Sequence, residues 1–579
     1  MLKILKKINI LMDKQQKLSM LKLLVMMVVS ALLETGAVFM VMSIVTIILD
    51  PVSMVEGKTY QTICGILHIE STMTFSALAI LACILMYVIK NGFAFVLQRS
   101  LYRFTFRNQF KTAKNLMLSF VKRDYEYYLE AETSVIQRSI TADVSNMYQL
   151  ILSVLQIASE CIVALFLVVY LATLDIIMTV IIGVLLVVTL FVIKKIIKPI
   201  MNRTGKENQD FGAQMFSWIQ QIVQGIKDIK VAGKEQYFIN EYSKVGEGYV
   251  KAMERQNIFN NTPKLLIETV SIAGLLLYIM VLILSGRDVS GMVSLLSAFA
   301  VAAMRLLPAA SRINNQMTSM AFNEPFFFNV SDNLVAETDK EHTDISYAVA
   351  TNEKLPVHEN IQFKNITYHY PNSDKLIFNK ANVNFPIGKS VGVVGASGAG
   401  KTTIIDILLG LLNLQDGEVL ADGVNIKDHY RQWLCNVGYI PQMIFLLDAD
   451  IRKNVAFGVP EEEIDEKKLW YALSEAQLDD FVRGLPEGVN TSIGERGIRL
   501  SGGQRQRIGI ARALYNDPEV LILDEATSAL DNDTESAIMD SINRLHGKKT
   551  LVIIAHRLQT IEKCDMVFRV ENGQILKER

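Results

Sequence analysis

Cysteine, proline and charge are all scarce in this chain of 579 residues. Its five cysteines are scattered and form no CxxC pair, which excludes a secreted disulfide scaffold and favours reduced thiols in a protein that faces the cell interior. Only 20% of the residues are charged, below the roughly 25% of soluble proteins, and 50% are hydrophobic, which excludes a disordered chain. The 58 basic and 59 acidic residues nearly cancel, so we expect no nucleic acid as a partner.

The hydrophobic residues are concentrated before residue 310, in stretches long enough to cross a membrane. A bilayer core needs about 20 consecutive, mainly apolar helical residues. A single such stretch is compatible with a buried helix of a soluble protein, but six of them favour a membrane domain. The predicted spans are residues 23–49, 75–97, 150–173, 176–197, 265–285 and 289–308.

Lysine and arginine alternate between the connections of these spans. The N-terminal segment and the connections between spans 2 and 3 and between spans 4 and 5 are basic, whereas the other three connections hold at most one base each. Cytosolic connections carry the excess of positive charge, so both termini are predicted to lie in the cytosol. The two long basic connections contain few glycines and prolines, so we expect spans 2 to 5 to continue as helices into the cytosol.

Two shorter segments have the spacing of amphipathic helices. Residues 2–17 place Leu2, Leu5, Ile8 and Leu11 among lysines, which suits a helix at the inner membrane surface; the alternative is a polar start to span 1. Residues 60–67, between spans 1 and 2, are predicted to form a small amphipathic helix on the outer surface.

A glycine-rich phosphate loop follows a predicted strand in the second half of the chain. Short β-like runs alternate with helices from residue 358 onward, which indicates an α/β domain. The loop has the GxxxxGK[ST] pattern between a strand at 391–394 and a helix, the context that supports phosphate binding. Lys401 is expected to reach the β- and γ-phosphates, and the Thr402 hydroxyl to ligate Mg²⁺. The loop residues are Gly395, Ala396, Ser397, Gly398, Ala399, Gly400, Lys401, Thr402 and Thr403.

Two further motifs complete a candidate hydrolytic site. Residues 520–525 read as a buried strand that ends in two carboxylates. Asp524 fits the acid beside Mg²⁺, and Glu525 is placed to orient or deprotonate the attacking water; without the phosphate loop we would interpret them as surface acids at a strand end. A second helix start, predicted to be capped by Ser501, offers another anion site formed by Ser501, Gly502, Gly503 and Gln504.

The sequence LSGGQ at 500–504, between the phosphate loop and the acidic strand, resembles ATP-binding cassette (ABC) proteins over residues 358–579. The resemblance implies ATP and Mg²⁺ as cofactors, with the LSGGQ of one chain closing over the ATP held by another. It also implies that Tyr370 stacks on adenine and that Gln442 contacts both Mg²⁺ and the membrane domain. Asp531, in the segment 528–531, would communicate between the two sites, and His556 would contact the γ-phosphate.

Six spans fused to one such domain resemble the exporter type of ABC protein. The resemblance implies an all-α, six-helix transmembrane domain at 1–335, a linker at 336–357 and an α/β P-loop ATP-binding domain at 358–579. It makes the chain an ATP hydrolase coupled to transport. Because one chain holds one copy of every motif, a homodimer with two equivalent sites is the expected assembly.

Ionisable residues inside the predicted spans are the best indication of the cargo, because each is costly in a membrane. Lys90 and Arg305 lie at similar depths in spans 2 and 6, and Arg312 follows two helical turns later. They are candidates for binding an anionic cargo. The alternative is that their side chains snorkel to the interface or lie in water beyond the helix ends.

The stretch 304–313 and the lysine-rich start resemble the bacterial lipid-linked oligosaccharide flippases of protein N-glycosylation. That resemblance implies a polyprenyl-diphosphate-linked glycan, moved from the inner to the outer leaflet of the bacterial plasma membrane. The alternatives are export of other amphipathic lipids, drugs or peptides. A soluble ATPase of the DNA-repair kind and an ATP-gated receptor or channel are alternatives from other classes; six spans disfavour the first and Glu525 disfavours the second.

Overall fold

The structure, a computed structural model, describes residues 2–49, 72–174, 176–284, 293–338, 353–524, 538–539, 542–554 and 561–579. The chain divides into two compact units. The helical unit comprises Met1–Val121 and Ala131–Glu341, and the α/β unit comprises Lys122–Glu130 and His342–Arg579. The short segment Lys122–Glu130 therefore belongs with the α/β unit although helices of the other unit flank it in sequence.

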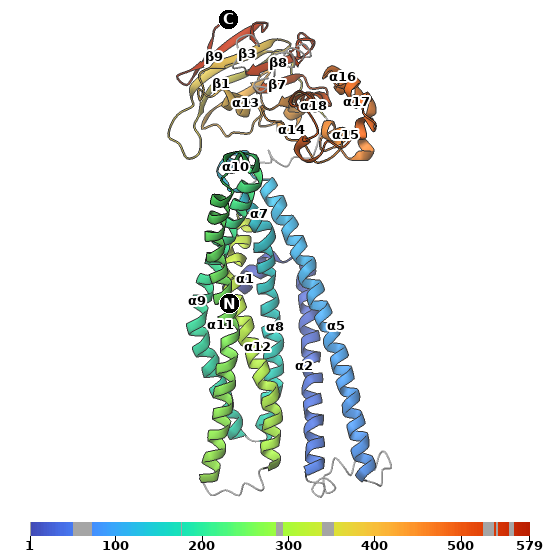
Figure 1. Cartoon of the computed structure of the whole chain (residues 1–579), viewed down its shortest axis with the longest axis vertical. Coiled ribbons are helices and arrows are strands. Elements are labelled where there is room, and N and C mark those ends of the chain that lie inside the picture. Colours follow the sequence, from blue (N-terminus) through green and yellow to red (C-terminus); the bar gives the residue numbers. More distant parts are fainter. Residues whose placement is uncertain are drawn as a thin grey trace. The chain divides into compact units, whose positions relative to one another are not determined.

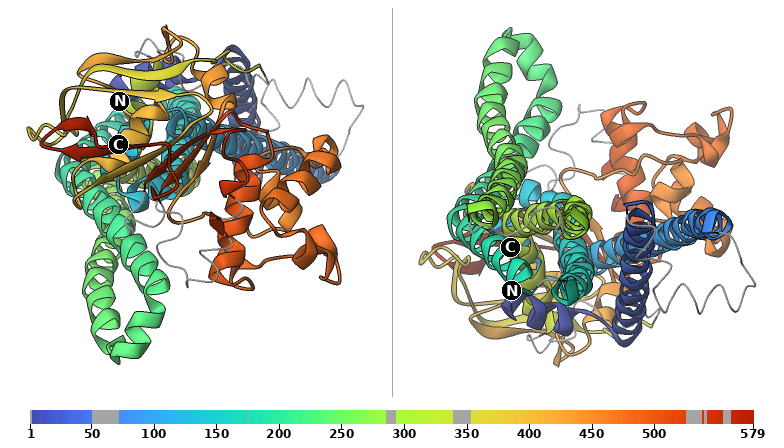
Figure 2. Two further views of the ribbon diagram at one scale, coloured as in Figure 1. Left: turned by 90° about the horizontal axis from the view of Figure 1, so that it is seen from above. Right: turned by 90° about the horizontal axis from the view of Figure 1, so that it is seen from below.

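Long helices that run side by side form the helical unit (Figure 1). The predicted continuation of the spans as long helices is confirmed for α5, which runs for 50 residues, about 75 Å at 1.5 Å per residue. Figure 2 shows the hairpin of α9 and α11, with α10 at its tip, leading away from the other helices of this unit. The helices are α1 (Leu2–Leu11), α2 (Lys14–Leu49), α5 (Thr72–Val121), α7 (Thr133–Arg138), α8 (Val144–Leu174), α9 (Ile176–Gln224), α10 (Ile226–Ala232), α11 (Glu235–Leu284) and α12 (Val293–Thr338).

Four helices in the described part of the chain are long and apolar enough to cross a membrane. They cover Lys14–Val41, Met73–Val121, Thr133–Val169 and Thr179–Gln224, which contain or overlap the first four predicted spans. The last two predicted spans fall on the ends of α11 and α12 that adjoin residues 285–292, which lie outside the described residues. The predicted outer helix at 60–67 also lies outside them.

Helix α1 confirms the predicted N-terminal helix. Ile8 of the predicted apolar face is buried at 4% exposure and Ile4 at 1%, whereas Leu5 is 44% exposed. The place of this helix at the inner membrane surface stays a prediction. The Lys7 ammonium pairs with Asp332 on α12 and lies 4.9 Å from the ring centroid of Phe328.

Helices α9 and α12 approach each other closely at a glycine. A Cβ on Gly205 would lie 2.1 Å from the carbonyl oxygen of Phe322, so only glycine fits there without a backbone shift. An apolar cluster lies beside this contact and includes Met201, Ile267 and Phe326, all fully or almost fully buried. The close approach fixes the spacing between these two helices.

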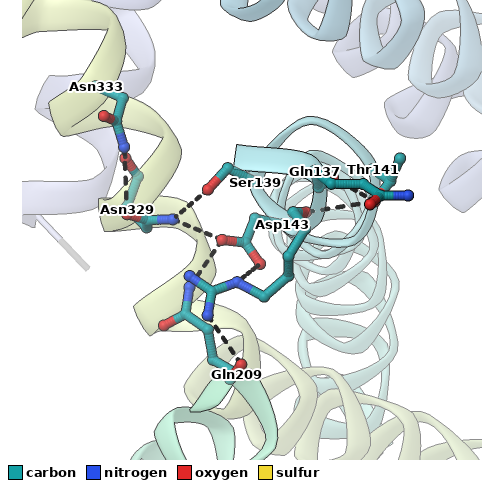
Figure 3. A network of polar contacts seen from close by, with 8 residues as sticks. Gln137, Ser139, Thr141, Asp143, Gln209, Asn329 and Asn333 are labelled. Carbon is teal, nitrogen blue, oxygen red and sulfur yellow. Dashed lines mark hydrogen bonds and ion pairs between the residues drawn. The ribbon is translucent and has the colours of Figure 1, made fainter. Parts of the chain in front are cut away.

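A buried polar network joins α8, α9 and α12 (Figure 3). A π-helical turn, Ser139–Asp143, precedes α8 and places Asp143 between the helices, with no exposed surface. Its carboxylate accepts hydrogen bonds from Gln209 on α9, at 2.9 Å, and from Asn329 on α12. The guanidinium of Arg138, 7% exposed, lies 3.4 Å from the same carboxylate. The Asp143 carboxylate therefore links the turn that precedes α8 to both α9 and α12.

The α/β unit contains two sheets. The antiparallel sheet has the order β2-β1-β4-β5, and the mainly parallel sheet has the order β10-β9-β3-β8-β7-β6. Its strands are β1 (Asn360–Tyr368), β2 (Phe378–Pro386), β3 (Ser390–Gly395), β4 (Asp416–Ala421), β5 (Val424–Asn425), β6 (Val437–Ile440), β7 (Val520–Asp524), β8 (Thr550–Ile554), β9 (Met566–Glu571) and β10 (Gln574–Lys577).

Parallel pairing of β3 with β8 and of β7 with β8 brings the carboxyl ends of β3 and β7 to one edge of the sheet. Ligands bind at such edges in open α/β sheets. The helices of this unit are α6 (Tyr125–Glu130), α13 (Lys401–Leu408), α14 (Tyr430–Cys435), α15 (Ile451–Val455), α16 (Glu466–Glu475), α17 (Asp479–Arg483) and α18 (Gly502–Leu514).

Candidate active site

The phosphate loop connects the end of β3 to the start of α13. Gly398 and Gly400 have φ values of 77° and 105°, in the left-handed region that favours glycine. A Cβ on Gly400 would also lie 2.7 Å from the Ile377 side chain. Both glycines are therefore required by the loop's path, which aims backbone N–H groups and the positive end of α13 at one point.

Lys401 lies at the centre of this loop. Its side chain is 6% exposed, and the ammonium donates hydrogen bonds to the carbonyl oxygens of Gly395 and Ala396, both at 3.1 Å. Both of these partners are neutral, and a buried cation attracts an anion strongly because low-dielectric surroundings screen its charge poorly. The loop therefore concentrates positive charge where phosphate oxygens are expected.

Two carboxylates in this part of the α/β unit lie close enough to interact. Asp524 ends β7 and is 7% exposed, and Asp406 lies on α13. Burial, and then the nearby charge of Asp524, raise the pKa of Asp406 to about 6. The same two causes raise the pKa of the Tyr439 hydroxyl, which also bonds to Asp524. Crowding of acidic groups in a buried place favours binding of a cation.

The residues present fit Mg²⁺ held jointly with phosphates. Thr402 offers a hydroxyl and Asp524 a carboxylate, and Mg²⁺ prefers such oxygen ligands together with water and substrate phosphates. The described residues contain no group of three or more His, Cys, Asp or Glu side chains that would hold a metal alone.

Tyr370 reaches the start of α13 from the loop after β1. Its hydroxyl hydrogen-bonds the Thr403 hydroxyl at 3.0 Å. Its ring meets Tyr368 edge-on, with 5.3 Å between centroids. Tyr368 is completely buried, whereas Tyr370 is only partly so. Of these two rings, that of Tyr370 is the one with exposed surface on which an adenine base could stack.

Helix α6 supplies a contact that the sequence analysis missed. The Glu126 carboxylate accepts hydrogen bonds from the backbone N–H and side-chain amide of Asn413, at 3.1 and 3.2 Å. It also accepts one from the Tyr368 hydroxyl at 3.2 Å. A chain of contacts through the Tyr368 and Tyr370 rings thus connects Glu126 to Thr403. Its only sequence signal was the short aromatic segment 125–130 within a basic stretch.

The second helix start has the capping geometry expected of Ser501. The Ser501 hydroxyl accepts a hydrogen bond from the Gln504 backbone N–H at 3.2 Å, and the Gln504 side chain accepts one from the Ser501 N–H at 2.8 Å. This capping box orders the first turn of α18, in which Gly502 is exposed and Gly503 is buried. An anion can be bound there.

Several predicted site residues are not brought into the described site. Glu525, Asp531 and His556 lie outside the described residues. Gln442 is exposed in the segment after β6. Their roles remain predictions.

The three candidate cargo residues do not share a described contact cluster. Lys90 on α5 lies 4.7 Å from the ring centroid of Tyr87. Arg312 on α12 makes a two-pronged ion pair with Glu160 on α8, with Nε–Oε1 and Nη2–Oε2 distances of 2.6 and 3.0 Å. Arg305 belongs to α12, but its side chain is outside the described atoms.

Residues 378–528 match the ABC transporter family. The ATP-dependent lipid A-core flippase of Haemophilus influenzae is 30% identical over 390 residues, which are 66% of this chain and 64% of that protein. The chain therefore matches slightly less than two thirds of that flippase's length. ABC transporter B family member 19 of Arabidopsis thaliana is 41% identical over 223 residues, 38% of this chain and 18% of that protein.

The structure is also similar to a solved structure, that of a bacterial Atm1-family ABC exporter with ATP bound. The TM-score is 0.75 at 20% sequence identity, and the match covers 97% of this chain and 94% of the other. This likeness concerns the fold. The predicted fold class, a helical transmembrane region fused to an α/β ABC domain, is confirmed.

Proposed function

We propose that this chain, which has the ABC exporter fold and matches the ABC transporter family at 378–528, is one half of an ATP-driven lipid flippase. The observation that carries the proposal is the joining of a phosphate loop, an acidic strand end and a capped LSGGQ helix in one unit. That unit follows helices able to cross a membrane. We place the chain in the bacterial plasma membrane with both termini in the cytosol.

ATP hydrolysis follows from the roles of these groups. Lys401 neutralises the β- and γ-phosphates, and Tyr370 stacks on adenine. Thr402 and Asp524 hold Mg²⁺, which when bound withdraws charge from the phosphates. Glu525 orients and deprotonates the attacking water.

A homodimer supplies both halves of each ATP site. Each chain has one phosphate loop and one anion-binding start of α18, so the Ser501 end of one copy closes over the nucleotide of the other.

Mixed dimers test the composite site. A Lys401→Ala chain paired with a Ser501→Arg chain keeps one intact site, whereas neither homodimer keeps any. We therefore expect hydrolysis in the mixed dimer and almost none in either variant homodimer. Full hydrolysis by an isolated monomer would contradict the proposal.

The proposed cargo is a polyprenyl-diphosphate-linked oligosaccharide, moved from the inner to the outer leaflet. The similar Haemophilus influenzae protein is a lipid A-core flippase, which supports a lipid as cargo. Lys90, Arg305 and Arg312 would bind the diphosphate. Arg312 already holds a carboxylate with both prongs of its guanidinium, the geometry that also suits phosphate. The diphosphate would take the place of Glu160.

Flipping and hydrolysis measured on the same reconstituted variants test this cargo. Arg305→Lys should impair flipping although the charge remains, and Arg305→Ala should impair it more, while basal hydrolysis survives. Glu160→Gln should strengthen cargo binding, because it removes the anion that competes for Arg312. The matched control is Glu268→Gln, an exposed glutamate on α11. Normal flipping in Arg305→Ala, or flipping of unrelated amphipathic lipids or drugs at the same rate, would favour a general exporter.

A further inference from the structure

A cavity of about 340 Å³ lies among α8, α9, α11 and α12 in the helical unit. All its lining residues lie on the cytosolic side of the predicted spans. Asn208 comes eleven residues after the span that ends at 197, and Thr318 comes ten residues after the span that ends at 308. The lining residues are Asn146, Gln149, Asn208, Tyr249, Met253, Gln256, Asn260, Thr318, Ser319, Phe322 and Asn323.

The chemistry of this lining is unusual for the inside of a helix bundle. Six carboxamide side chains and three hydroxyl groups face it, with two aromatic rings and no charged side chain. Each amide both donates and accepts hydrogen bonds, as each sugar hydroxyl does. A charged ligand would find nothing to neutralise it there. The lining therefore suits a neutral, polyhydroxylated group.

Two polar atoms of the lining lack hydrogen-bond partners among the described residues. The Nδ2 group of Asn208, in a side chain 8% exposed, has no acceptor, and the Oδ1 atom of Asn260 has no donor. Buried polar groups are normally paired. Both atoms have almost no accessible surface, so a bound group pairs with either one after its amide turns toward the cavity.

The cavity lies in line with the Glu160–Arg312 ion pair. Ser319 follows Arg312 by seven residues on α12, almost two turns, so both lie on the same face about 10 Å apart along the axis. The Ser319 hydroxyl in turn meets Ser153 on α8 at 3.4 Å, seven residues before Glu160. On both helices, the serine beside the cavity therefore lies seven residues to the cytosolic side of the residue that forms the ion pair.

We propose that this cavity binds the first sugar units of the cargo, held by amides while the diphosphate lies at Arg312. The identity of the cargo rests on the proposed function, whereas the preference for a neutral saccharide rests on the lining alone. The aromatic rings of Tyr249 and Phe322 offer surface for the apolar face of a sugar ring. The site therefore distinguishes a glycosylated lipid from the bare lipid diphosphate.

The test measures binding of two probes to the full-length protein in lipid nanodiscs. One probe is polyprenyl diphosphate, and the other is the same lipid carrying a neutral trisaccharide. The wild type should bind the glycosylated lipid more tightly. The double variant Asn208→Leu/Asn323→Leu should bind the glycosylated lipid roughly 5- to 150-fold more weakly, as expected for two lost neutral hydrogen bonds, and the bare lipid unchanged.

Asn257→Leu is the matched control, because this exposed amide on α11 bonds only the Met253 carbonyl of its own helix. It should leave the binding of both lipids unchanged. Ser319→Phe, which fills the cavity and removes no amide, should reproduce the selective loss. Basal ATP hydrolysis reports whether each variant is folded, and Ser319→Phe decides the question if the double variant is not.

Equal binding of the two lipids by the wild type would overturn the inference, and so would an equal loss in Asn257→Leu. Free trisaccharide separates this inference from the proposed function. If no lipid-linked saccharide binds, but free trisaccharide binds to the wild type and not to Ser319→Phe, the cargo proposal fails and the saccharide site stands.

Discussion

Replacing Asp143 with alanine should destabilise the helical unit by about 3–5 kcal/mol, the typical cost of removing one partner of a buried ion pair. The reason is the environment of its partner. Arg138 is 7% exposed, and among the residues that the structure describes its guanidinium would keep one hydrogen bond without Asp143, to the Gln209 carbonyl at 2.9 Å. The side-chain amides of Gln209 and Asn329 each lose their bond to the carboxylate as well.

Thermal unfolding of the purified protein in detergent measures this loss. The helical unit has 332 residues, and at about 2.1 cal/mol/K of unfolding entropy per residue 1 kcal/mol shifts its midpoint by roughly 1.4 °C, so Asp143→Ala should lower it by roughly 4–7 °C. The double variant Arg138→Met/Asp143→Leu should recover most of the loss, because no buried charge remains unpaired. The control is Lys244→Ala, which breaks an exposed ion pair with Glu241 and should leave the midpoint almost unchanged. A midpoint for Asp143→Ala equal to that control would refute the reasoning.

Three further predictions follow from single contacts. Tyr370→Ala should weaken ATP binding roughly 5- to 150-fold in a direct titration, as expected for a lost aromatic–base stack, while Tyr370→Trp should be mild. Gly205→Ala should lower the unfolding midpoint, because its Cβ would meet the Phe322 carbonyl oxygen at 2.1 Å; an unchanged midpoint would show that the helices separate at little cost. Asp406 has a folded-state pKa raised to about 6, so its contribution to stability is present near pH 4 and is lost as the pH rises through 6. Asp406→Asn should therefore flatten the pH dependence of unfolding between about pH 4 and 6, and an unchanged pH profile would contradict the assignment.

Features set by neighbouring residues could be predicted from the sequence. The glycines of the phosphate loop, the Ser501 cap and the long helices all depend on contacts within a few residues or on composition alone. Asp524 was found because a buried strand with a terminal acid is a local pattern. The helix at the N-terminus was predictable in the same way, but the burial of Ile4 was not, because it depends on neighbouring helices that no local pattern reveals.

Features that join distant segments could not be predicted. Arg312 was noticed as a charge near the spans, but its pairing with Glu160 joins residues 152 positions apart. The amide cavity draws single residues from four helices, so no one helix carries a recognisable motif. Glu126 was missed for the same reason, since Asn413 lies 287 positions away.

The central claim is that this chain uses ATP hydrolysis to flip a lipid-linked saccharide. The most direct test is transfer of a fluorescent polyprenyl-diphosphate oligosaccharide across proteoliposomes that contain the purified protein. We expect transfer with ATP and Mg²⁺, none with a non-hydrolysable ATP analogue, and none in Glu525→Gln, which should still bind ATP. Transfer at equal rates with and without ATP, or in Glu525→Gln as in the wild type, would contradict the account.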